Sequence, residues 1–263
     1  MSQTASLDGV FIHDGATFEA TPLARGPWSP DSQHGGAPAA LLMRAFERLD
    51  GSGLAIARVT YEFVRPVPLG HLHVDVEVVR PGRRVQLMEG AIRTSGGTEV
   101  VRAHALRVMP AHADAPRTAP QPPPPGPERG VENDYVSEHG PTFARDALEI
   151  RFIEGAFYRI GPATAWFRLR KPIVAGEQPS PLQRLAAAGD FGNGIAAALP
   201  WEQYVFINPD LTLYIDRLPV GDWIGLESRM IVANDGIGNA ESVLYDRTGR
   251  VGAATQSLLV APR

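Results

Sequence analysis

The first half of the chain combines one helical pattern with several strand patterns. Apolar residues recur at steps of four across residues 35–49, which predicts a helix with a broad apolar face. Residues 71–79 alternate apolar and polar positions, the period of a strand with one buried face. Residues 85–93 and 99–108 are two further strand candidates, separated by a turn at Ser95-Gly96-Gly97.

The second half repeats this order. Residues 181–199 are predicted to be helical, with an interruption at the glycine-rich stretch 189–194. Strand patterns follow at 210–216, 223–232, 239–245 and 252–260. A helix followed by antiparallel strands therefore occurs twice along the chain.

A weak internal repeat agrees with this duplication. Residues 65–70 resemble 217–221, and the turn at 95–100 resembles the turn at 246–251, at an offset of 151 to 152 residues. The pattern predicts an α+β fold in which each half wraps a sheet around one helix. We expect the two sheets to pair edge to edge, because that leaves fewer open edges.

A proline-rich stretch divides the two halves. Eight of the 24 prolines lie between Pro110 and Pro127, where no apolar periodicity remains and the extended polyproline conformation is favoured. We interpret residues 111–130 as a linker between an N-terminal unit, 1–110, and a C-terminal unit, 131–263.

Composition narrows the classes of function. The net charge of -4 gives no basic footprint for nucleic acid. The absence of cysteine excludes thiol catalysis and Cys-ligated metal, and suits a reducing cytoplasm.

No signal peptide and no apolar run long enough to span a membrane is present, so we expect a cytoplasmic protein. No cofactor or metal site is predicted, since His71 and His73 fit a solvated strand face.

Several motifs, in this order and spacing, resemble those of one superfamily. They are Gln33-His34-Gly35-Gly36, the segment 58–66, Asp190-Phe191-Gly192-Asn193-Gly194, the segment 206–212, and the segment 240–246 with Gln256 downstream. The chain resembles the double hotdog thioesterases, relatives of the acyl-CoA thioesterase II family. The resemblance implies two tandem hotdog units forming a double hotdog, with an acyl-CoA site at the seam between them.

The resemblance also implies a mechanism. Thioesterases of this family use an Asp, a Thr or Ser, and a Gln to activate a water that attacks the thioester carbonyl, without a covalent enzyme intermediate. The Asp falls on Asp210 and the Gln on Gln256. The Thr or Ser position falls on or near Ile231, which cannot bind a water by hydrogen bonds. Asn234 and Asp235, a few residues on, are candidates for the missing polar group.

Each catalytic candidate has a structural alternative. Asp210 either orients the attacking water or caps the turn after Asn208-Pro209. Gln256 either faces inward, where its amide needs partners, or faces solvent, since strand alternation allows both.

The candidates for substrate binding lie at the two helices. Gly35 and Gly36 either present helix-terminal amides to a thioester carbonyl or allow close packing, and His34 either donates to substrate or is structural. Asp190 and Asn193 form the corresponding polar cluster of the second half, where the glycines either serve the site or allow the two helices to pack closely.

The sequence therefore predicts an acyl-CoA thioesterase-like hydrolase acting on an acyl-CoA or acyl-carrier thioester. The alternative is a non-hydrolytic acyl-CoA or acyl-carrier binding protein that has lost the catalytic set at Ile231. We also expect a homo-oligomer, because exposed sheet edges favour association.

Overall fold

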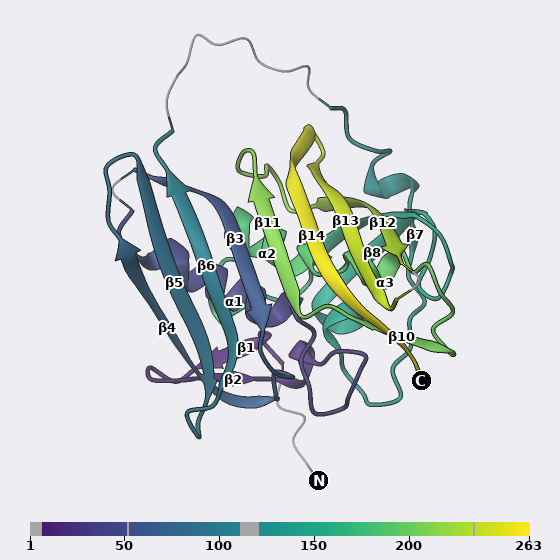
Figure 1. Cartoon of the computed structure of the whole chain (residues 1–263), viewed down its shortest axis with the longest axis horizontal. Helices are drawn as coiled ribbons and strands as arrows, with labels where there is room; N and C mark the ends of the chain where they lie inside the picture. Colours follow the sequence, from purple (N-terminus) through teal and green to yellow (C-terminus); the bar gives the residue numbers. More distant parts are fainter. Residues whose placement is uncertain (1–6, 52, 111–120, 234) are drawn as a thin grey trace.

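A single antiparallel sheet runs through the computed structural model, which describes residues 7–51, 53–110, 121–233 and 235–263. Residues 111–120 of the predicted linker lie outside the described residues, as does Asn234. The strand order is β1-β2-β4-β5-β6-β3-β11-β14-β13-β12-β9-β8-β7, and β10 pairs with β14 (Figure 1).

The first half contributes β1 to β6 and one long helix. The bounds are β1 Phe11–His13, β2 Phe18–Ala20, the 3-10 turn η1 Pro22–Ala24, α1 Gly36–Arg48, β3 Ala55–Phe63, β4 Gly70–Arg80, β5 Val85–Thr94 and β6 Glu99–Val108. The helix and the strands predicted for this half are confirmed within one residue at each end.

The second half contributes the other strands and two short helices. The bounds are η2 Pro127–Arg129, β7 Val131–Glu132, the π-helical turn η3 Phe143–Ala147, β8 Leu148–Glu154, β9 Ala163–Leu169, α2 Pro181–Gly189, α3 Gly192–Ile195, β10 Tyr204–Ile207, β11 Asp210–Ile215, β12 Ile224–Val232, β13 Ile237–Asp246 and β14 Gly249–Pro262. The predicted helical region 181–199 is thus interrupted as expected, but it ends at Ile195.

The sequence pattern does not reveal the remaining strands. β1, β2 and β7 are two or three residues long, too short to show an alternation. β8 and β9 are buried on both faces through most of their length, so their residues do not alternate in polarity.

The two halves meet where β3 pairs with β11, which confirms the predicted edge-to-edge pairing. Thr60 lies opposite Thr212, 152 residues later, and the Thr212 hydroxyl donates to the Thr60 hydroxyl at 3.0 Å. This separation equals the offset of the sequence repeat. Equivalent residues of the two halves therefore face each other at the junction, as expected around a local twofold axis.

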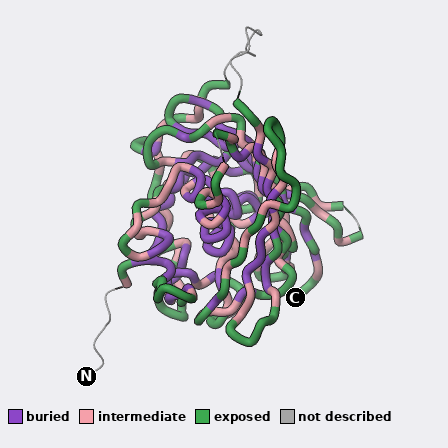
Figure 2. The backbone as a smooth tube through the Cα atoms, turned by 90° about the vertical axis from the view of Figure 1, so that its left-hand side faces the viewer, coloured by how far each residue is buried: buried purple, intermediate pink, exposed green. Residues whose placement is uncertain are grey.

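The two main helices lie side by side behind the sheet and form the centre of the core. Figure 2 shows that the buried backbone is concentrated in these helices and in the strands around them. Ten of the 13 residues of α1 are buried, and α1 contacts α2, β4 and β5. The helices run antiparallel, because Gly36 at the start of α1 lies against Ala187 near the end of α2, while Glu47 near the end of α1 contacts Ser180 before α2.

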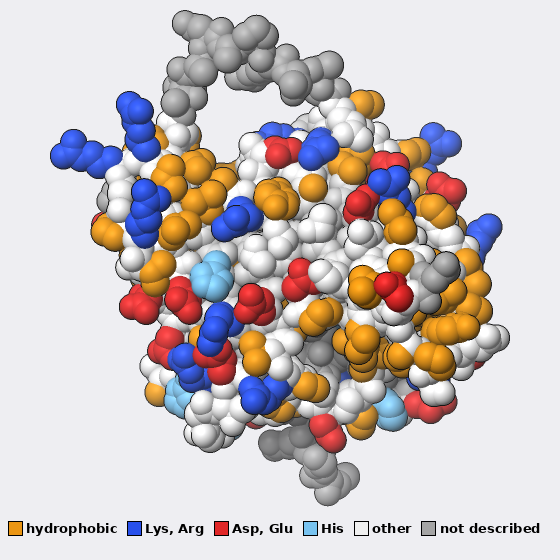
Figure 3. Space-filling view, in the orientation of Figure 1, with side chains coloured by type: hydrophobic (Ala, Val, Ile, Leu, Met, Phe, Trp, Pro, Cys, Tyr) orange, Lys and Arg blue, Asp and Glu red, His pale blue; other side chains and the backbone are white. Residues whose placement is uncertain are grey.

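The opposite face of the sheet is largely open to solvent. Hydrophobic side chains gather there over β10 and β12 to β14, beside charged residues (Figure 3). Ile207, Ile231, Ile237 and Leu259 are between 42% and 64% exposed. Among the described residues, the structure contains no helix that is long and apolar enough to span a membrane.

The described part of the predicted linker packs on the second half. The Gln121 side-chain amide donates to the Tyr245 hydroxyl at 2.7 Å, and the Trp166 indole donates to the Pro125 carbonyl at 2.7 Å. The chain between β6 and β7 is therefore anchored from residue 121 onward.

A half-buried carboxyl group connects the helices at the end where α1 finishes. Glu47 Oε2 accepts hydrogen bonds from the Ser180 hydroxyl at 2.6 Å and from the Gln183 amide at 3.4 Å. Arg107, 3% exposed, closes the same end by donating to the carbonyls of Phe46 and Leu49. Burial raises the pKa of Glu47 above its usual 4.5, because desolvation outweighs the hydrogen bonds and the nearby arginines.

This raised pKa predicts a pH dependence of stability. The folded state binds the Glu47 proton more tightly than the unfolded state does, so stability falls as pH rises from about 4.5 through the folded-state pKa. Glu47→Gln should therefore be more stable than the wild type at pH 7, with the difference shrinking toward pH 4. Urea unfolding of the wild type and the variant at both pH values measures this difference in the free energy of unfolding. If Glu47→Gln instead lost the same stability at both pH values, Glu47 would stabilise the fold only by accepting hydrogen bonds, and its protonation would play no part.

Candidate active site

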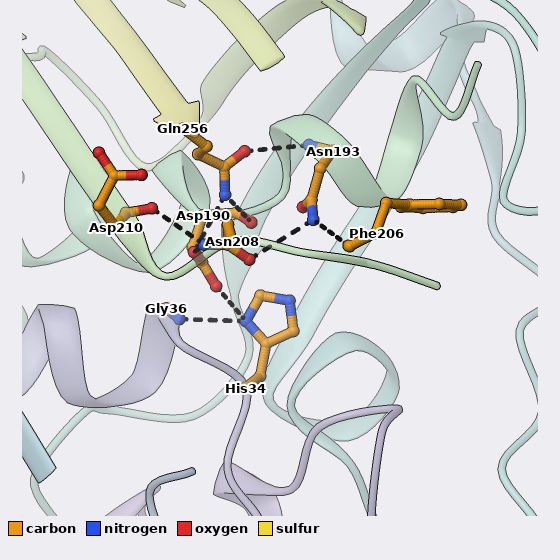
Figure 4. A network of polar contacts seen from close by, with 8 residues as sticks. All are labelled: His34, Gly36, Asp190, Asn193, Phe206, Asn208, Asp210 and Gln256. Carbon is orange, nitrogen blue, oxygen red and sulfur yellow. Dashed lines mark hydrogen bonds and ion pairs between the residues drawn. The ribbon is translucent and has the colours of Figure 1, made fainter. Parts of the chain in front are cut away.

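A buried carboxylate lies at the break between α2 and α3. Asp190 is 5% exposed and follows Gly189, the last residue of α2. Its Oδ1 accepts hydrogen bonds from Asn208 Nδ2 at 2.8 Å and from Gln256 Nε2 at 3.2 Å (Figure 4). The glycine-broken helix thus places a carboxyl group in the core, and the segment before β11 and the strand β14 each supply one amide donor for it.

The amide side chains around Asp190 form a closed network. Gln256 Nε2 also donates to the Asp190 carbonyl at 3.1 Å, and Gln256 Oε1 accepts from the Asn193 backbone amide at 3.0 Å. Asn193 Nδ2 donates to the Phe206 carbonyl at 3.2 Å and lies 3.4 Å from Asn208 Oδ1. These contacts hold each amide group in one orientation.

Glycine is needed where α3 approaches this network. A Cβ on Gly192 would lie 2.8 Å from Gln256 Oε1 and 2.7 Å from the Ser242 hydroxyl, closer than packed atoms come. The Ser242 hydroxyl is itself paired with that of Ser228 at 2.7 Å. Close packing and the polar network thus both account for the glycine-rich interruption.

His34 approaches the carboxylate from the first half of the chain. Its Nδ1 lies 3.1 Å from Asp190 Oδ2 and 3.1 Å from the Gly36 backbone amide, and its ring stacks on Phe191 with centroids 4.1 Å apart. Nδ1 makes only one of these two contacts as a hydrogen bond at a time. With a proton it donates to Asp190, and without one it accepts from Gly36.

The two glycines of the first half bring the start of α1 against Asp190. A Cβ on Gly35 would lie 2.6 Å from Asp190 Oδ2, and a Cβ on Gly36 would lie 2.5 Å from the Ala187 carbonyl oxygen. Both positions therefore require glycine for close packing. The helix terminus, with its partial positive charge, therefore faces the Asp190 side chain.

The structure does not bring Asp210 to this network, which corrects the predicted pairing of Asp210 with Gln256. Asp210 Oδ1 accepts from the Ser257 backbone amide at 2.6 Å, and only the Asp210 carbonyl meets the network, at 3.2 Å from Asn208 Nδ2 (Figure 4). Asp210 alternates with the buried Leu211 on β11, whereas Gln256 is 2% exposed and alternates with the exposed Ser257 on β14. The two side chains therefore lie on opposite faces of the sheet.

A bulge explains why Asn208 turns inward. Ile207 pairs with Leu259, and Thr212 pairs with Thr255, so four residues (208–211) face three (256–258). The extra residue interrupts the alternation, which aims Asn208 at Asp190 and Asp210 at the outer face. From the sequence, Asn208 is expected only in a turn, because the Asn-Pro pair precedes the strand pattern that begins at residue 210.

The other predicted candidates lie elsewhere. Ile231 is 49% exposed on the outer face of β12, so it is not a member of the site. Asp235 is exposed in the turn between β12 and β13, and Asn234 lies outside the described residues. No group of three or more histidine, aspartate or glutamate side chains able to hold a metal ion occurs among the residues that the structure describes.

A pocket of about 330 Å³ opens beside the network. His34, Phe191 and Gly194 line the part nearest Asp190 and Asn193. The remaining wall includes five aromatic rings, Trp28, Tyr135, Phe157, Tyr158 and Trp201, and three charged residues, Arg25, Glu202 and Arg263. Small-molecule sites in proteins commonly have this combination of an apolar cavity and a few fixed polar groups.

Comparisons with known proteins agree on one family. The acyl-CoA thioesterase N-terminal domain model matches residues 24–108, and the acyl-CoA thioesterase C-terminal domain model matches residues 113–260. The search of curated protein sequences found no match. The predicted resemblance to this thioesterase family is confirmed.

Solved structures show the same fold. A hotdog-fold protein of unknown function from Alicyclobacillus acidocaldarius has a TM-score of 0.74 at 17% identity, over 98% of this chain and 97% of that one. A proposed thioesterase II from Thermobifida fusca has a TM-score of 0.72 at 18% identity, over 99% of each chain. An acyl-CoA thioesterase II from Mycobacterium marinum has a TM-score of 0.66 at 17% identity, over 92% of this chain and 96% of that one. The chain therefore has the hotdog fold.

The close approach of α1 to α2 predicts the effect of a single methyl group. Gly36→Ala should lower the free energy of unfolding by about 1–3 kcal/mol, because the new Cβ meets a backbone oxygen that cannot move without the helix. Gly96→Ala is the matched control, since its Cβ would have no neighbour closer than 3.8 Å. Urea denaturation of both variants tests this expectation, and equal stabilities would contradict the described packing.

Proposed function

The chain belongs to the acyl-CoA thioesterase family, and from this premise we propose that it hydrolyses an acyl thioester at the Asp190 network. We further propose that residues 1–110 and 131–263 are two tandem hotdog units forming a double hotdog. The antiparallel junction of β3 with β11, in which Thr60 pairs with Thr212, 152 residues later, supports this division. The observation that carries the proposed activity is the buried carboxylate with its amide partners beside an apolar pocket.

Asp190 is the proposed general base. Its Oδ1 is occupied by Asn208 and Gln256, while Oδ2 lies at His34 and retains a lone pair that can accept a hydrogen bond from a water. The amide donors fix the carboxylate in place, so that a water bound to Oδ2 is held in one position.

The reaction balances without a covalent enzyme intermediate. The water oxygen attacks the thioester carbonyl carbon while Asp190 accepts a proton from that water. Collapse of the tetrahedral intermediate breaks the carbon–sulfur bond, and the proton held by Asp190 passes to the departing thiolate. The products are a carboxylic acid and a free thiol.

The start of α1 is the proposed place of the thioester carbonyl. Gly35 and Gly36 bring this helix terminus to Asp190, and its partial positive charge stabilises negative charge developing on the carbonyl oxygen. His34 lines the pocket at the same point, and its Nδ1 lies next to Asp190 Oδ2. We propose that the His34 ring contacts the substrate there.

Non-hydrolytic binding of an acyl-CoA or acyl-carrier thioester is the alternative. The motive for this alternative was Ile231, which stands where the family has a Thr or Ser. The side chain of Ile231 is exposed on β12, away from the Asp190 network, so it does not argue against hydrolysis at that network. The alternative therefore becomes an outcome of the test below.

A matched pair of isosteric variants tests the proposal. Asp190→Asn should lower kcat for octanoyl-CoA by about 10²–10⁴-fold, because the amide cannot accept the water proton. Asp210→Asn should change kcat less than about threefold, because its carboxylate lies on the outer face of the sheet. A thiol reagent measures the released CoA without interference from the protein, which has no cysteine.

The results distinguish hydrolysis at Asp190, hydrolysis at Asp210 and binding without hydrolysis. Loss of activity in Asp210→Asn with retention in Asp190→Asn would overturn the proposed site. Binding of octanoyl-CoA by the wild type without release of thiol would favour the non-hydrolytic alternative. Circular dichroism of both variants controls for loss of folding.

A further inference from the structure

We propose that the pocket selects a flat, aromatic acyl group over a straight alkyl chain of the same carbon number. This inference rests on the proposed function, because it takes the pocket next to Asp190 as the acyl site. It names the class of acyl group, which family membership alone leaves open.

Six aromatic rings from separate segments of the chain line the pocket. The rings belong to Trp28, Tyr135, Phe157, Tyr158, Phe191 and Trp201. Trp28 and Trp201 stack with ring centroids 5.2 Å apart, and Tyr158 meets Trp201 edge to face at 5.7 Å. Such a wall offers both ring faces and ring edges, the two surfaces against which another aromatic ring packs most favourably.

Tyr158 is held in this wall at a cost in backbone energy. Its φ of 65° is in the left-handed region, and it is the only residue other than glycine there in the described part of the chain. Its side chain is nevertheless 56% exposed, and that of Trp28 is 38% exposed. Residues held in strained backbone conformations cluster at ligand-binding sites, and the exposed part of the Tyr158 ring is available to a ligand.

The size of the pocket favours the same class of acyl group. A volume of about 330 Å³ is near the lower end for small-molecule sites, about 300–1,000 Å³, which suits a compact group. Arg25, Glu202 and Arg263 also line the pocket. Arg25 directs Nε and Nη1 to the carbonyls of Pro30, His139 and Pro141. A rigid ring also loses less conformational freedom on binding than an alkyl chain does.

Two thioesters with eight acyl carbons each provide the test, phenylacetyl-CoA and octanoyl-CoA. The wild type should favour phenylacetyl-CoA by about tenfold in kcat/KM, the effect expected from one or two good ring contacts. The dissociation constants of the two thioesters, measured by calorimetry on the Asp190→Asn variant, should differ in the same direction.

Variants of the wall identify the rings responsible. Tyr158→Gly should reduce the preference at least threefold without lowering the melting temperature, since glycine adopts a positive φ freely and little buried area is lost. Trp201→Leu should reduce the preference further. Trp223→Leu is the matched control, because Trp223 lies outside the pocket against Arg168 and should leave the ratio unchanged.

The result separates this inference from the proposed function. Equal or better use of octanoyl-CoA by the wild type, or an unchanged ratio in both wall variants, would overturn the aromatic preference while leaving hydrolysis intact. If neither thioester were hydrolysed, the proposed function would fail. The two dissociation constants would still decide whether the pocket prefers the ring.

Discussion

The burial of one carboxylate determines how the rest of the site is built. Removing an ionised carboxylate from water costs several kcal/mol unless partners replace its hydration. Asp190 obtains these partners from three separate elements: the start of α1, the bulged segment before β11 and the strand β14. The glycines at 35 and 192 follow from the same requirement, since a side chain at either position would collide with the carboxylate or with its amide partner.

The junction of the two half-sheets makes this arrangement possible. Pairing of β3 with β11 places the two helices antiparallel behind one continuous sheet, so that the start of α1 meets the end of α2. His34 and the glycines come from the first half, and Asp190, Asn208 and Gln256 come from the second. Neither half contains the complete site. The opposite end of the helix pair has a carboxyl group as well, Glu47, but there the partners are Ser180 and Gln183.

Periodicity predicted most of the framework, because α1 and the long strands each have one buried face. The helix 35–49, the later strands and the inward side chain of Gln256 fit that rule. Asp190 and Asn193 were also identified, from the glycines that interrupt a helix. Asp210 and Gln256 do not lie together as expected, for a physical reason: one extra residue between β10 and β11 reverses the face on which a side chain lies, and spacing along the chain does not record a bulge. Asn208 was missed for the same reason.

The most direct measurement of the central claim is a crystal structure with a non-hydrolysable ketone analogue of an acyl-CoA, in which a methylene group replaces the thioester sulfur. If Asp190 is the base, one ordered water will bridge Asp190 Oδ2 and the ketone carbon, within hydrogen-bond distance of the carboxylate, about 2.6–3.2 Å. The acyl group will lie among the rings of Trp28, Tyr158 and Trp201. An analogue bound on the Asp210 face of the sheet, or one whose ketone carbon lies far from Asp190, would contradict the account.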